Sequence, residues 1–507
     1  MAFPGLLYGL AIVGVPFSCP TVTSDHDLSR SKPNTGIDTG SERNITLWAG
    51  KALERPWEST AIPFGDPSGQ SNILPRAIEF TVAGGCLRLF EQQFDALGGD
   101  THLSQCGCGA LLGVPKPHRS KAGRLKSPSP QAGCVRVLQY LELEARLQRS
   151  GIGTATAHQR AALRAAPEDV DIVEQPWRGG TPAAAARSLA TGSRSIVEYD
   201  LAHCNTIGPT SLAVARHARR TGRPLVLHAH VTAADFARSF RGSTQAAPLL
   251  GRYLRRFYSQ ADLVICPSEY TRSRLLDLGV DAPIRAVSNG VDHESLAGFE
   301  SLRNTYRDRF GLSGTVVFAV GNVFERKGLS TFCRVAEQFH QAGRDEFEFV
   351  WFGPYDTGLG AARTVRYWLA NKPPNVTFTG WVDDKRGAFA AGDIFWFPTT
   401  EENQGIAVLE AMACGKPVVL RDLPVFREYY TPGEDCLMAT TDDAFAELLR
   451  MLAANPNRRR RLARHAKATA ATHSLDRLAT ELLSYYHQLL TVGATQTETL
   501  TGRTPSL

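Results

Sequence analysis

The chain has 507 residues, of which 43% are apolar and 21% are charged, and its formal net charge is +6 at pH 7. This length and composition predict a globular protein of two or three domains. The charge is too small for the length to indicate nucleic-acid binding, and no apolar stretch reaches the roughly 18 residues that span a bilayer. Residues 1–18 lack the positive n-region of an export signal. We therefore expect a cytoplasmic protein, either soluble or peripheral on the inner face of a membrane.

Residues 1–133 differ from the rest of the chain, because they are rich in Gly, Pro and Ser and show no sustained hydrophobic period. Within them, His102, Cys106 and Cys108 have the spacing H-x3-C-x-C, which matches no strong zinc-ligand pattern. We expect an atypical, disordered leader. A lineage-specific extension and a start assigned upstream of the true one are the alternatives.

A regular alternation of strands and helices begins near residue 134 and predicts a first Rossmann-like domain over residues 134–296. Ser150–Thr154, with two glycines, is expected to be a flexible loop before a helix at Ala155–Ala166, and residues 285–311 are expected to be a linker. The expected strands are Val135–Leu141, Val170–Val173, Leu201–Cys204, Leu225–His230 and Leu263–Cys266, and the other expected helices are Ser211–Thr221 and Leu249–Ser259.

A second alternation predicts another Rossmann-like domain over residues 309–472. An amphipathic helix is predicted at Leu475–Leu490, within a terminal segment at 473–492, and a tail follows at 493–507. The fold class is therefore α/β. The strands expected in this domain are Val316–Val320, Glu348–Phe352, Val376–Thr379, Ile394–Phe397 and Val418–Leu420.

The most informative segment runs from Glu402 to Leu420. Glu402 and Glu410 lie eight positions apart around the start of a predicted helix, which ends at Gly415 before a Val-Val-Leu strand. Two glutamates at this spacing are common by chance, but this helix and strand are the context that a doubly wound sheet provides. An acidic residue before a helix, a glycine and free first-turn amides suit an anion that carries hydroxyls, and a nucleotide-sugar is such a ligand.

This segment resembles the E-x7-E motif of the retaining glycosyltransferases of family 4, which have the GT-B fold. Two more blocks occur in the family's order, because Ala261–Thr271 resembles the block that ends its first domain and Asn289–Asp292 resembles its interdomain turn. The resemblance extends from about Val135 to Leu490. It implies an acceptor domain at 134–296 and a nucleotide-sugar domain at 309–472 that face a central cleft, with the terminal helix returning towards the first domain.

The resemblance also implies roles for the residues around the motif. Glu402 is expected to face the donor sugar, Glu410 the ribose hydroxyls, and the amides near Gly405 and Ile406 the distal phosphate. The family's usual Gly-Phe after the first glutamate is Asn403-Gln404 in this chain, so we expect the sugar selectivity to differ.

Transfer from a nucleotide-sugar leaves a diphosphate, whose charge either a metal ion or a lysine with helix N-termini can stabilise. No Asp-x-Asp stands in a setting that suggests a metal, so we expect neither metal nor cofactor. The candidate cation is Lys327, in a segment that resembles the family's G-R-L-x-x-x-K-G. Asn322 replaces the family's arginine, and we expect Arg326 to substitute for it and to bind the donor with Asn322 and Lys327.

His228 and His230 end a predicted strand, where open α/β sheets bind ligands, and alternation sends both to one face. His230 resembles the family's histidine near the sugar; a purely structural histidine is the alternative. Gly151 and Gly153 are expected to let the first-domain backbone approach the diphosphate. We thus expect Glu402, His230 and Lys327 to be the catalytic residues.

The resemblance predicts a retaining, metal-independent transferase that moves a hexose from a UDP- or GDP-sugar to a hydroxyl acceptor, such as a glycolipid or surface polysaccharide. Arg238–Arg241 and the arginines of Leu249–Phe257 are candidates to meet a lipid phosphate. Clusters of basic residues suggest either solvated helix faces or peripheral contact with an anionic membrane. The rival interpretations are a nucleotide-sugar epimerase of GT-B architecture and a non-catalytic nucleotide-sugar binding protein.

Overall fold

The computed structural model describes residues 134–177, 196–233, 243–356 and 362–501. The predicted leader at 1–133 and the arginines of Arg238–Arg241 lie outside these residues. None of the described helices combines the length and the apolar character that a membrane-spanning segment needs.

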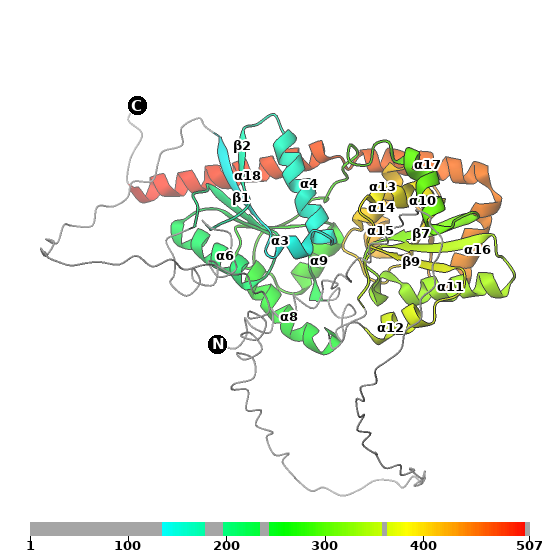
Figure 1. Cartoon of the computed structure of the whole chain (residues 1–507). Coiled ribbons are helices and arrows are strands. Elements are labelled where there is room, and N and C mark those ends of the chain that lie inside the picture. The colour runs from blue at the N-terminus through cyan, green and yellow to red at the C-terminus, as the bar shows by residue number, and fades with distance from the viewer. Residues whose placement is uncertain (1–133, 178–195, 234–242, 357–361, 502–507) are drawn as a thin grey trace, which may run out of the picture. The chain divides into compact units, whose positions relative to one another are not determined.

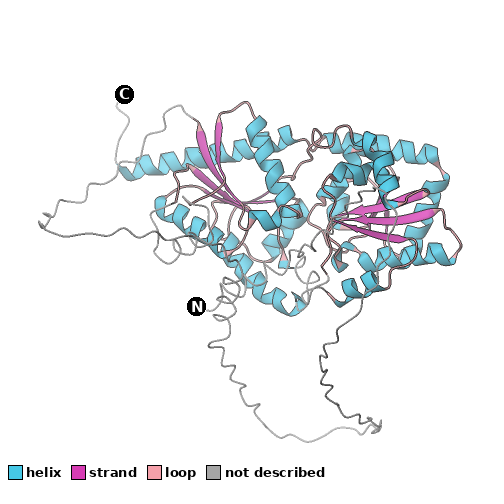
Figure 2. Ribbon diagram, in the orientation of Figure 1, coloured by secondary structure: helices cyan, strands magenta, loops and turns pink. Residues whose placement is uncertain are grey.

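The described residues form two parallel sheets of six strands each (Figures 1 and 2). The first sheet has the order β2-β1-β3-β4-β5-β6 and the second has the order β12-β11-β10-β7-β8-β9. We call the first sheet with its helices the N-terminal domain and the second sheet with its helices the C-terminal domain. The strands are β1 (Val135–Tyr140), β2 (Val170–Val173), β3 (Leu201–Cys204), β4 (Leu225–His228), β5 (Leu263–Cys266), β6 (Ile284–Ala286), β7 (Thr315–Val320), β8 (Phe347–Phe352), β9 (Val376–Gly380), β10 (Ile394–Phe397), β11 (Val418–Arg421) and β12 (Leu437–Ala439).

Apart from the connection between β2 and β3, which is only partly described, helices connect successive strands, and they cover both faces of each sheet (Figure 2). Those of the N-terminal domain are α3 (Glu144–Leu147), α4 (Gly151–Ala165), α6 (Pro209–Thr221), α8 (Ser243–Tyr258) and α9 (Glu269–Asp277). The remaining ones are η1 (Phe299–Leu302), α10 (Arg303–Phe310), η2 (Glu325–Lys327), α11 (Leu329–Gln341), α12 (Arg363–Ala370), α13 (Lys385–Ala391), α14 (Ile406–Ala413), α15 (Pro424–Tyr429), α16 (Asp442–Ala454), α17 (Pro456–Ala471) and α18 (Leu475–Thr501).

The strand orders fix where a ligand site belongs. Each order reverses once, between β1 and β3 in the first sheet and between β7 and β10 in the second. In doubly wound sheets the crevice at the carboxyl ends of the two strands that flank such a reversal binds ligands. The topology therefore directs attention to the loops that follow β1, β3, β7 and β10.

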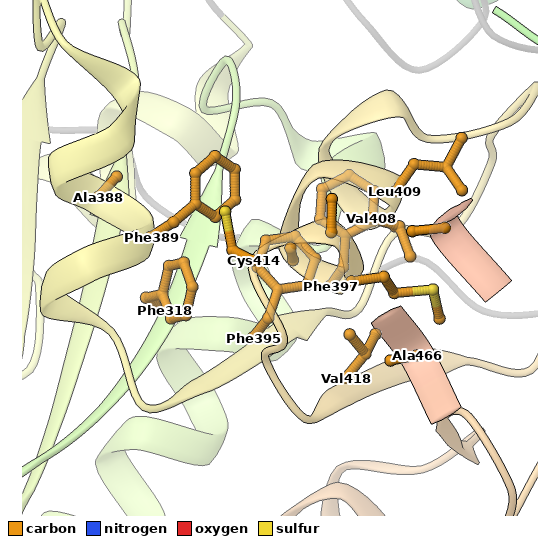
Figure 3. Packing of buried hydrophobic residues seen from close by; sticks show 14 of the residues in the cluster. Phe318, Ala388, Phe389, Phe395, Phe397, Val408, Leu409, Cys414, Val418 and Ala466 are labelled. Atoms are coloured by element: carbon orange, nitrogen blue, oxygen red, sulfur yellow. The ribbon is translucent and has the colours of Figure 1, made fainter. Parts of the chain in front are cut away.

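The cores explain why these segments are strands. Along β7, Val316 and Phe318 enter one core cluster and Val317 and Ala319 enter another, because successive side chains point to opposite faces. The first cluster joins aromatic side chains of the sheet to the apolar face of α14, including Leu409 (Figure 3). The start of α14 is thus held against a packed core.

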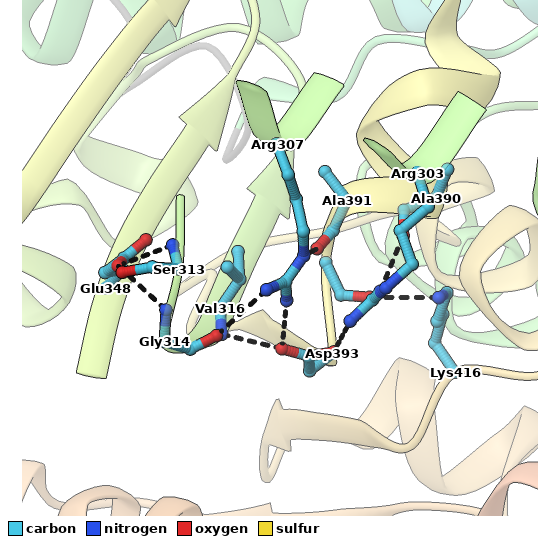
Figure 4. Close-up of polar contacts among 11 residues, drawn as sticks. Arg303, Arg307, Ser313, Gly314, Val316, Glu348, Ala390, Ala391, Asp393 and Lys416 are labelled. Carbon is cyan, nitrogen blue, oxygen red and sulfur yellow. Dashed lines mark hydrogen bonds and ion pairs between the residues drawn. The ribbon is translucent and has the colours of Figure 1, made fainter. Parts of the chain in front are cut away.

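A polar network closes the amino ends of β7, β10 and β11 (Figure 4). Asp393 accepts hydrogen bonds from Arg303 and Arg307, both at 2.6 Å, and from the amide of Val316 at 2.9 Å. Lys416 Nζ donates to the carbonyl of Gly392 at 2.9 Å, and burial lowers the pKa of Lys416 to about 8. These contacts hold α10 against the amino ends of the strands in the second sheet.

The predicted strands agree with the observed ones within two residues, but three other predictions need correction. Ser150–Thr154 is not a loop, because Gly151 begins α4 and Ser150 caps it by accepting a hydrogen bond from the amide of Gly153. The linker at 285–311 contains the end of β6, η1 and α10. The tail at 493–507 is helical as far as Thr501.

The terminal helix α18 packs on the sheet of the N-terminal domain. Leu478, Leu482 and Tyr486 of α18 are buried in one cluster with Val137 of β1 and Leu201 of β3. Figure 1 shows α18 running beside this sheet and α4.

Candidate active site

A cavity of about 460 Å³ lies at the carboxyl ends of the strands that flank the two reversals in strand order. Its walls come from the loops that follow β1, β3 and β4 in the N-terminal domain and β7 to β10 in the C-terminal domain. It is therefore formed at the carboxyl ends of strands of both sheets, as expected for doubly wound folds.

An ion pair between Lys327 and Glu402 joins the two loops that flank the reversal in the second sheet. Lys327 ends η2, and Gly328 follows it with φ +87°, where a Cβ atom would lie 2.2 Å from the carbonyl oxygen of Pro398. Only glycine fits this position, so the glycine after the lysine brings Lys327 close to the loop that follows β10. Both charged side chains are largely buried, with exposures of 15% and 10%.

The environment of Glu402 stabilises its charged form. Burial would raise the pKa of this carboxyl, but the charges of Lys327 and Arg326 and two hydrogen bonds outweigh it, so the pKa lies below its ordinary value. The hydrogen bonds come from Lys327 and from the amide of Asn403. Glu402 is therefore a carboxylate at neutral pH.

The N-terminus of α14 faces the same cavity. Gly405 caps the helix with φ +85°, a conformation that other residues rarely adopt, and Gly405 and Ile406 line the cavity. The amide of Val408 donates to the carbonyl of Gly405 at 2.9 Å, whereas the amides that begin a helix generally lack an acceptor within it, and the helix dipole adds positive potential there. The start of α14 and Lys327 together suit an anionic ligand group.

Glu410 lies one turn further along α14, is buried, and accepts a hydrogen bond from Lys385 Nζ at 2.6 Å. Burial would lower the pKa of Lys385, but Glu410 outweighs it and raises this pKa. Both residues line the cavity. The sequence analysis did not identify Lys385 as a site residue. Nothing in the sequence of the first turn of α13 shows that this lysine pairs with a glutamate 25 residues later. The ribose role of Glu410 stays a prediction.

Asn322 and Arg326 also line the cavity, after β7. The guanidinium of Arg326 donates to the carbonyl of Glu401 at 3.2 Å, and the carbonyl of Arg326 accepts from the amide of Thr400 at 2.7 Å. Arg326 thus connects the two loops that flank the reversal. Its substitution for the family's arginine stays a prediction.

The two glycines of α4 differ in their surroundings. Gly151 lines the cavity and has open space where a side chain would be. Gly153 is buried, and a Cβ atom there would lie 2.2 Å from the carbonyl oxygen of Leu147. The close packing of α3 on α4 therefore accounts for Gly153, and only Gly151 is placed for approach to a ligand in this cavity.

Three histidines form a stack, in which His228 and His230 line the cavity and His203 lies behind them. The rings of His228 and His230 are parallel with centroids 4.0 Å apart, so the prediction that they share a face is confirmed. His203 of β3 stacks on His228 at 5.5 Å. Burial lowers the pKa of His203 and of His230 to about 3, and it lowers the pKa of His228 well below 6.5. All three rings are neutral at physiological pH.

Asn205 orients His230 and has no counterpart in the sequence prediction. Asn205 Nδ2 donates to Gln139 Oε1 at 3.1 Å, which leaves Oδ1 to accept from His230 Nε2 at 3.0 Å. His230 therefore carries its proton on Nε2. Asn205 follows a buried strand directly, and that position was the signal that sequence reasoning overlooked.

Glu142 is a second site residue that the sequence prediction missed. It is buried, lines the cavity, and accepts hydrogen bonds from the amides of Thr210 and Ser211 at 3.3 and 3.1 Å. The N-terminus of α6 is therefore occupied by a carboxylate of the chain itself.

Within the described ranges, no group of three or more His, Cys, Asp or Glu residues is placed to hold a metal ion. The cations near the acidic residues of the cavity are Lys327, Arg326 and Lys385.

The chain matches two family models over most of these domains. Residues 142–295 match the model described as Glycosyltransferase Family 4, and residues 314–455 match the one described as Glycosyl transferases group 1. A processive diacylglycerol alpha-glucosyltransferase of Acholeplasma laidlawii is 32% identical over 320 residues, which cover 62% of this chain and 87% of that protein. An alpha-galactosylglucosyldiacylglycerol synthase of Streptococcus pneumoniae is 26% identical over 311 residues, 59% of this chain and 79% of that protein.

Solved structures share the fold. Anabaena HepE, crystallised with UDP and glucose, has a TM-score of 0.55 at 19% identity and covers 70% of this chain and 100% of its own. Sucrose-phosphate synthase of Thermosynechococcus elongatus has a TM-score of 0.59 at 16% identity, over 71% and 100%. Because the E-x7-E loop, both sheets and both family models agree, we conclude that this chain has the GT-B fold and is a glycosyltransferase of family 4.

Proposed function

We propose that the enzyme moves a hexose from a UDP- or GDP-sugar to a hydroxyl of a lipid-linked acceptor, with retention of configuration and without a metal ion. The observation that carries this proposal is the convergence of Lys327, Glu402 and the N-terminus of α14 on one cavity at a sheet reversal. This arrangement supports a carboxylate contact to the donor sugar beside a binding site for its phosphates.

The donor diphosphate would lie against Lys327 and the first-turn amides of α14. These groups stabilise the negative charge that develops as the bond between the anomeric carbon and the diphosphate breaks. Lys327 is paired with Glu402, so an incoming phosphate would share or take over this ammonium group. Glu402 would then be available to a sugar hydroxyl.

Retention fits an attack on the same face that the diphosphate leaves. The acceptor oxygen bonds to the anomeric carbon, the carbon–diphosphate bond breaks, and the departing phosphate oxygen takes the acceptor proton. His230 is neutral, so it would contribute a polar contact to the sugar or the leaving group and not an imidazolium acid. No glutamate needs to act as a nucleophile in this scheme.

An acceptor with an apolar part is supported by the relatives and by the cavity. Both relatives described above are named for reactions on diacylglycerol lipids. The N-terminal wall of the cavity includes Leu143, Ile207, Val231 and Leu250. Arg252, Arg255 and Arg256 of α8 are exposed and suit the anionic head groups of the inner face of a membrane. We therefore favour a glycolipid acceptor and a peripheral, cytoplasmic location.

The test is to incubate the purified chain with a panel of nucleotide-sugars, with and without diacylglycerol vesicles. Formation of free nucleotide and a glycolipid supports the proposal. An epimerised donor would instead indicate an epimerase, and binding without turnover a non-catalytic protein.

Metal independence is tested in the same assay with EDTA. We expect activity to persist, because Lys327 and α14 supply the positive potential at the diphosphate. A complete loss that added divalent metal restores would contradict this part of the proposal.

A further inference from the structure

The loop between β10 and α14 carries two buried side-chain amides, Asn403 and Gln404, with exposures of 9% and 1%. They stand where the family pattern has Gly-Phe. Glu402 precedes them and Gly405 follows them, so they form the centre of the donor-binding loop.

Asn403 reaches across the cleft to the N-terminal domain. Its Nδ2 donates to the carbonyl of His230 at 3.1 Å, and its Oδ1 accepts from the hydroxyl of Thr271 at 3.2 Å. Its own carbonyl accepts from the hydroxyl of Ser268 at 2.6 Å. A single residue of the C-terminal domain thus contacts the segments that follow β4 and β5, including the start of α9.

Gln404 binds the segment that connects the domains. Its Oε1 accepts from the amide of Asn289 at 2.9 Å, and its Nε2 donates to the hydroxyl of Ser288 at 2.6 Å. These contacts are independent of those of Asn403, since they involve different partners on a different part of the chain.

The contacts of Asn403 link Glu402 to His230. Asn403 is bonded to Glu402 by the peptide bond and to His230 by a hydrogen bond to its carbonyl. Buried amides that lose their partners cost free energy, so these hydrogen bonds resist separation of the two loops. Because misplacement of reacting groups by about 1 Å lowers rates by up to about 10²-fold, such a coupling has catalytic weight.

We propose that Asn403 and Gln404 are positioning residues that hold the donor-binding loop against the N-terminal domain and thereby set the position of Glu402 relative to His230. The expected effect on kcat rests on the proposed function, because it presupposes sugar transfer. It differs from the selectivity effect expected from the sequence, because the side-chain amides contact protein groups of the other domain.

The test uses Asn403→Ala, Gln404→Leu and the double variant Asn403→Gly/Gln404→Phe, which restores the family's pair. Asn375→Ala is the matched control, since Asn375 Nδ2 donates to the carbonyl of Ala336 at 2.9 Å within the C-terminal domain. We expect kcat to fall about 10-fold or more in the first three, with the donor KM within about two-fold of wild type. The control should keep the wild-type kcat. Gln404→Glu keeps the acceptor for the Asn289 amide and should rescue part of the loss.

Hydrogen exchange provides a readout that needs no substrate. The amide of Asn289 should exchange about 10-fold faster or more in Gln404→Leu than in wild type or Asn375→Ala, because its acceptor is removed. Unchanged exchange, or a wild-type kcat in the Asn403 and Gln404 variants, would overturn the inference. If the wild-type chain transfers no sugar, the proposed function fails, and the exchange experiment still decides whether the loop is held.

Discussion

At the scale of single residues, charge in the cavity is organised by pairs. Lys327 pairs with Glu402 and Lys385 pairs with Glu410, so each glutamate of the E-x7-E motif has its own lysine. Paired in this way, the carboxylates can lie near a diphosphate without net repulsion, and each pair can exchange partners with a ligand that carries both phosphates and hydroxyls.

Glu402→Gln and Lys327→Ala should each lower kcat by roughly 10²-fold or more, because the first would remove the proposed sugar contact and the second the charge proposed to face the leaving diphosphate. Initial rates of sugar transfer measure this. Glu346→Gln and Lys372→Ala are matched controls on exposed residues of the same domain, and they should transfer sugar at the wild-type rate. Wild-type rates in the first two variants would remove the basis of the site assignment.

The histidine stack predicts how stability depends on pH. In the folded chain the pKa values of His203, His228 and His230 are lowered, while in the unfolded chain histidine titrates near 6.5. Between these values the unfolded chain binds more protons, so the stability that these three rings contribute is fully present above about pH 6.5 and is lost as the pH falls towards 3. Each ring contributes a slope of up to about 1.4 kcal/mol per pH unit in this window.

Urea unfolding at several pH values between 7.5 and 5 measures this slope, and His203→Gln should reduce it by the share of one histidine. Glu402 does not interfere, because its pKa lies below the ordinary carboxyl value and its contribution is lost only at more acidic pH. Equal slopes in wild type and variant would contradict this prediction, because they would show that His203 has the same pKa in the folded and the unfolded chain.

At the scale of secondary-structure elements, the sequence was most informative where a short apolar run is buried on both faces. Ile394–Phe397 was predicted with the observed bounds because all four of its residues enter the core. The predicted start of α4 was wrong, because the low helix propensity of two glycines suggested a loop. The cap by Ser150 and the packing of Gly153 on Leu147 outweigh that propensity.

The site was only partly predictable for a related reason. Glu402, Lys327 and Gly405 stand in segments with a recognisable spacing, and the structure brings them to one cavity. Asn205 and Lys385 act through partners 25 residues away in the sequence, and only the fold brings each pair together.

The element α18 should be essential to the N-terminal domain. Leu482 is fully buried against the first sheet, and Leu482→Ala should destabilise the protein by about 2–5 kcal/mol. Gln488→Ala, on the exposed side of the same helix, is the control and should unfold at the wild-type urea concentration. A midpoint for Leu482→Ala equal to that of the control would mean that α18 is not docked as described.

At the scale of the whole molecule, the two domains are joined by contacts of different kinds. The connection through β6, η1 and α10 is covalent, α18 follows the C-terminal domain yet packs on the first sheet, and Asn403 and Gln404 bind across the cleft. Both family models fall within this joined unit, at 142–295 and 314–455.

We therefore predict that residues 134–507 fold and transfer sugar without residues 1–133. The first strand of the first sheet begins at Val135, and every described residue that lines the cavity lies beyond it. Melting temperature and sugar transfer of the shortened and the full chain make the comparison direct, and both should agree. An insoluble or inactive shortened chain would show that residues 1–133 cover apolar surface or complete the acceptor site.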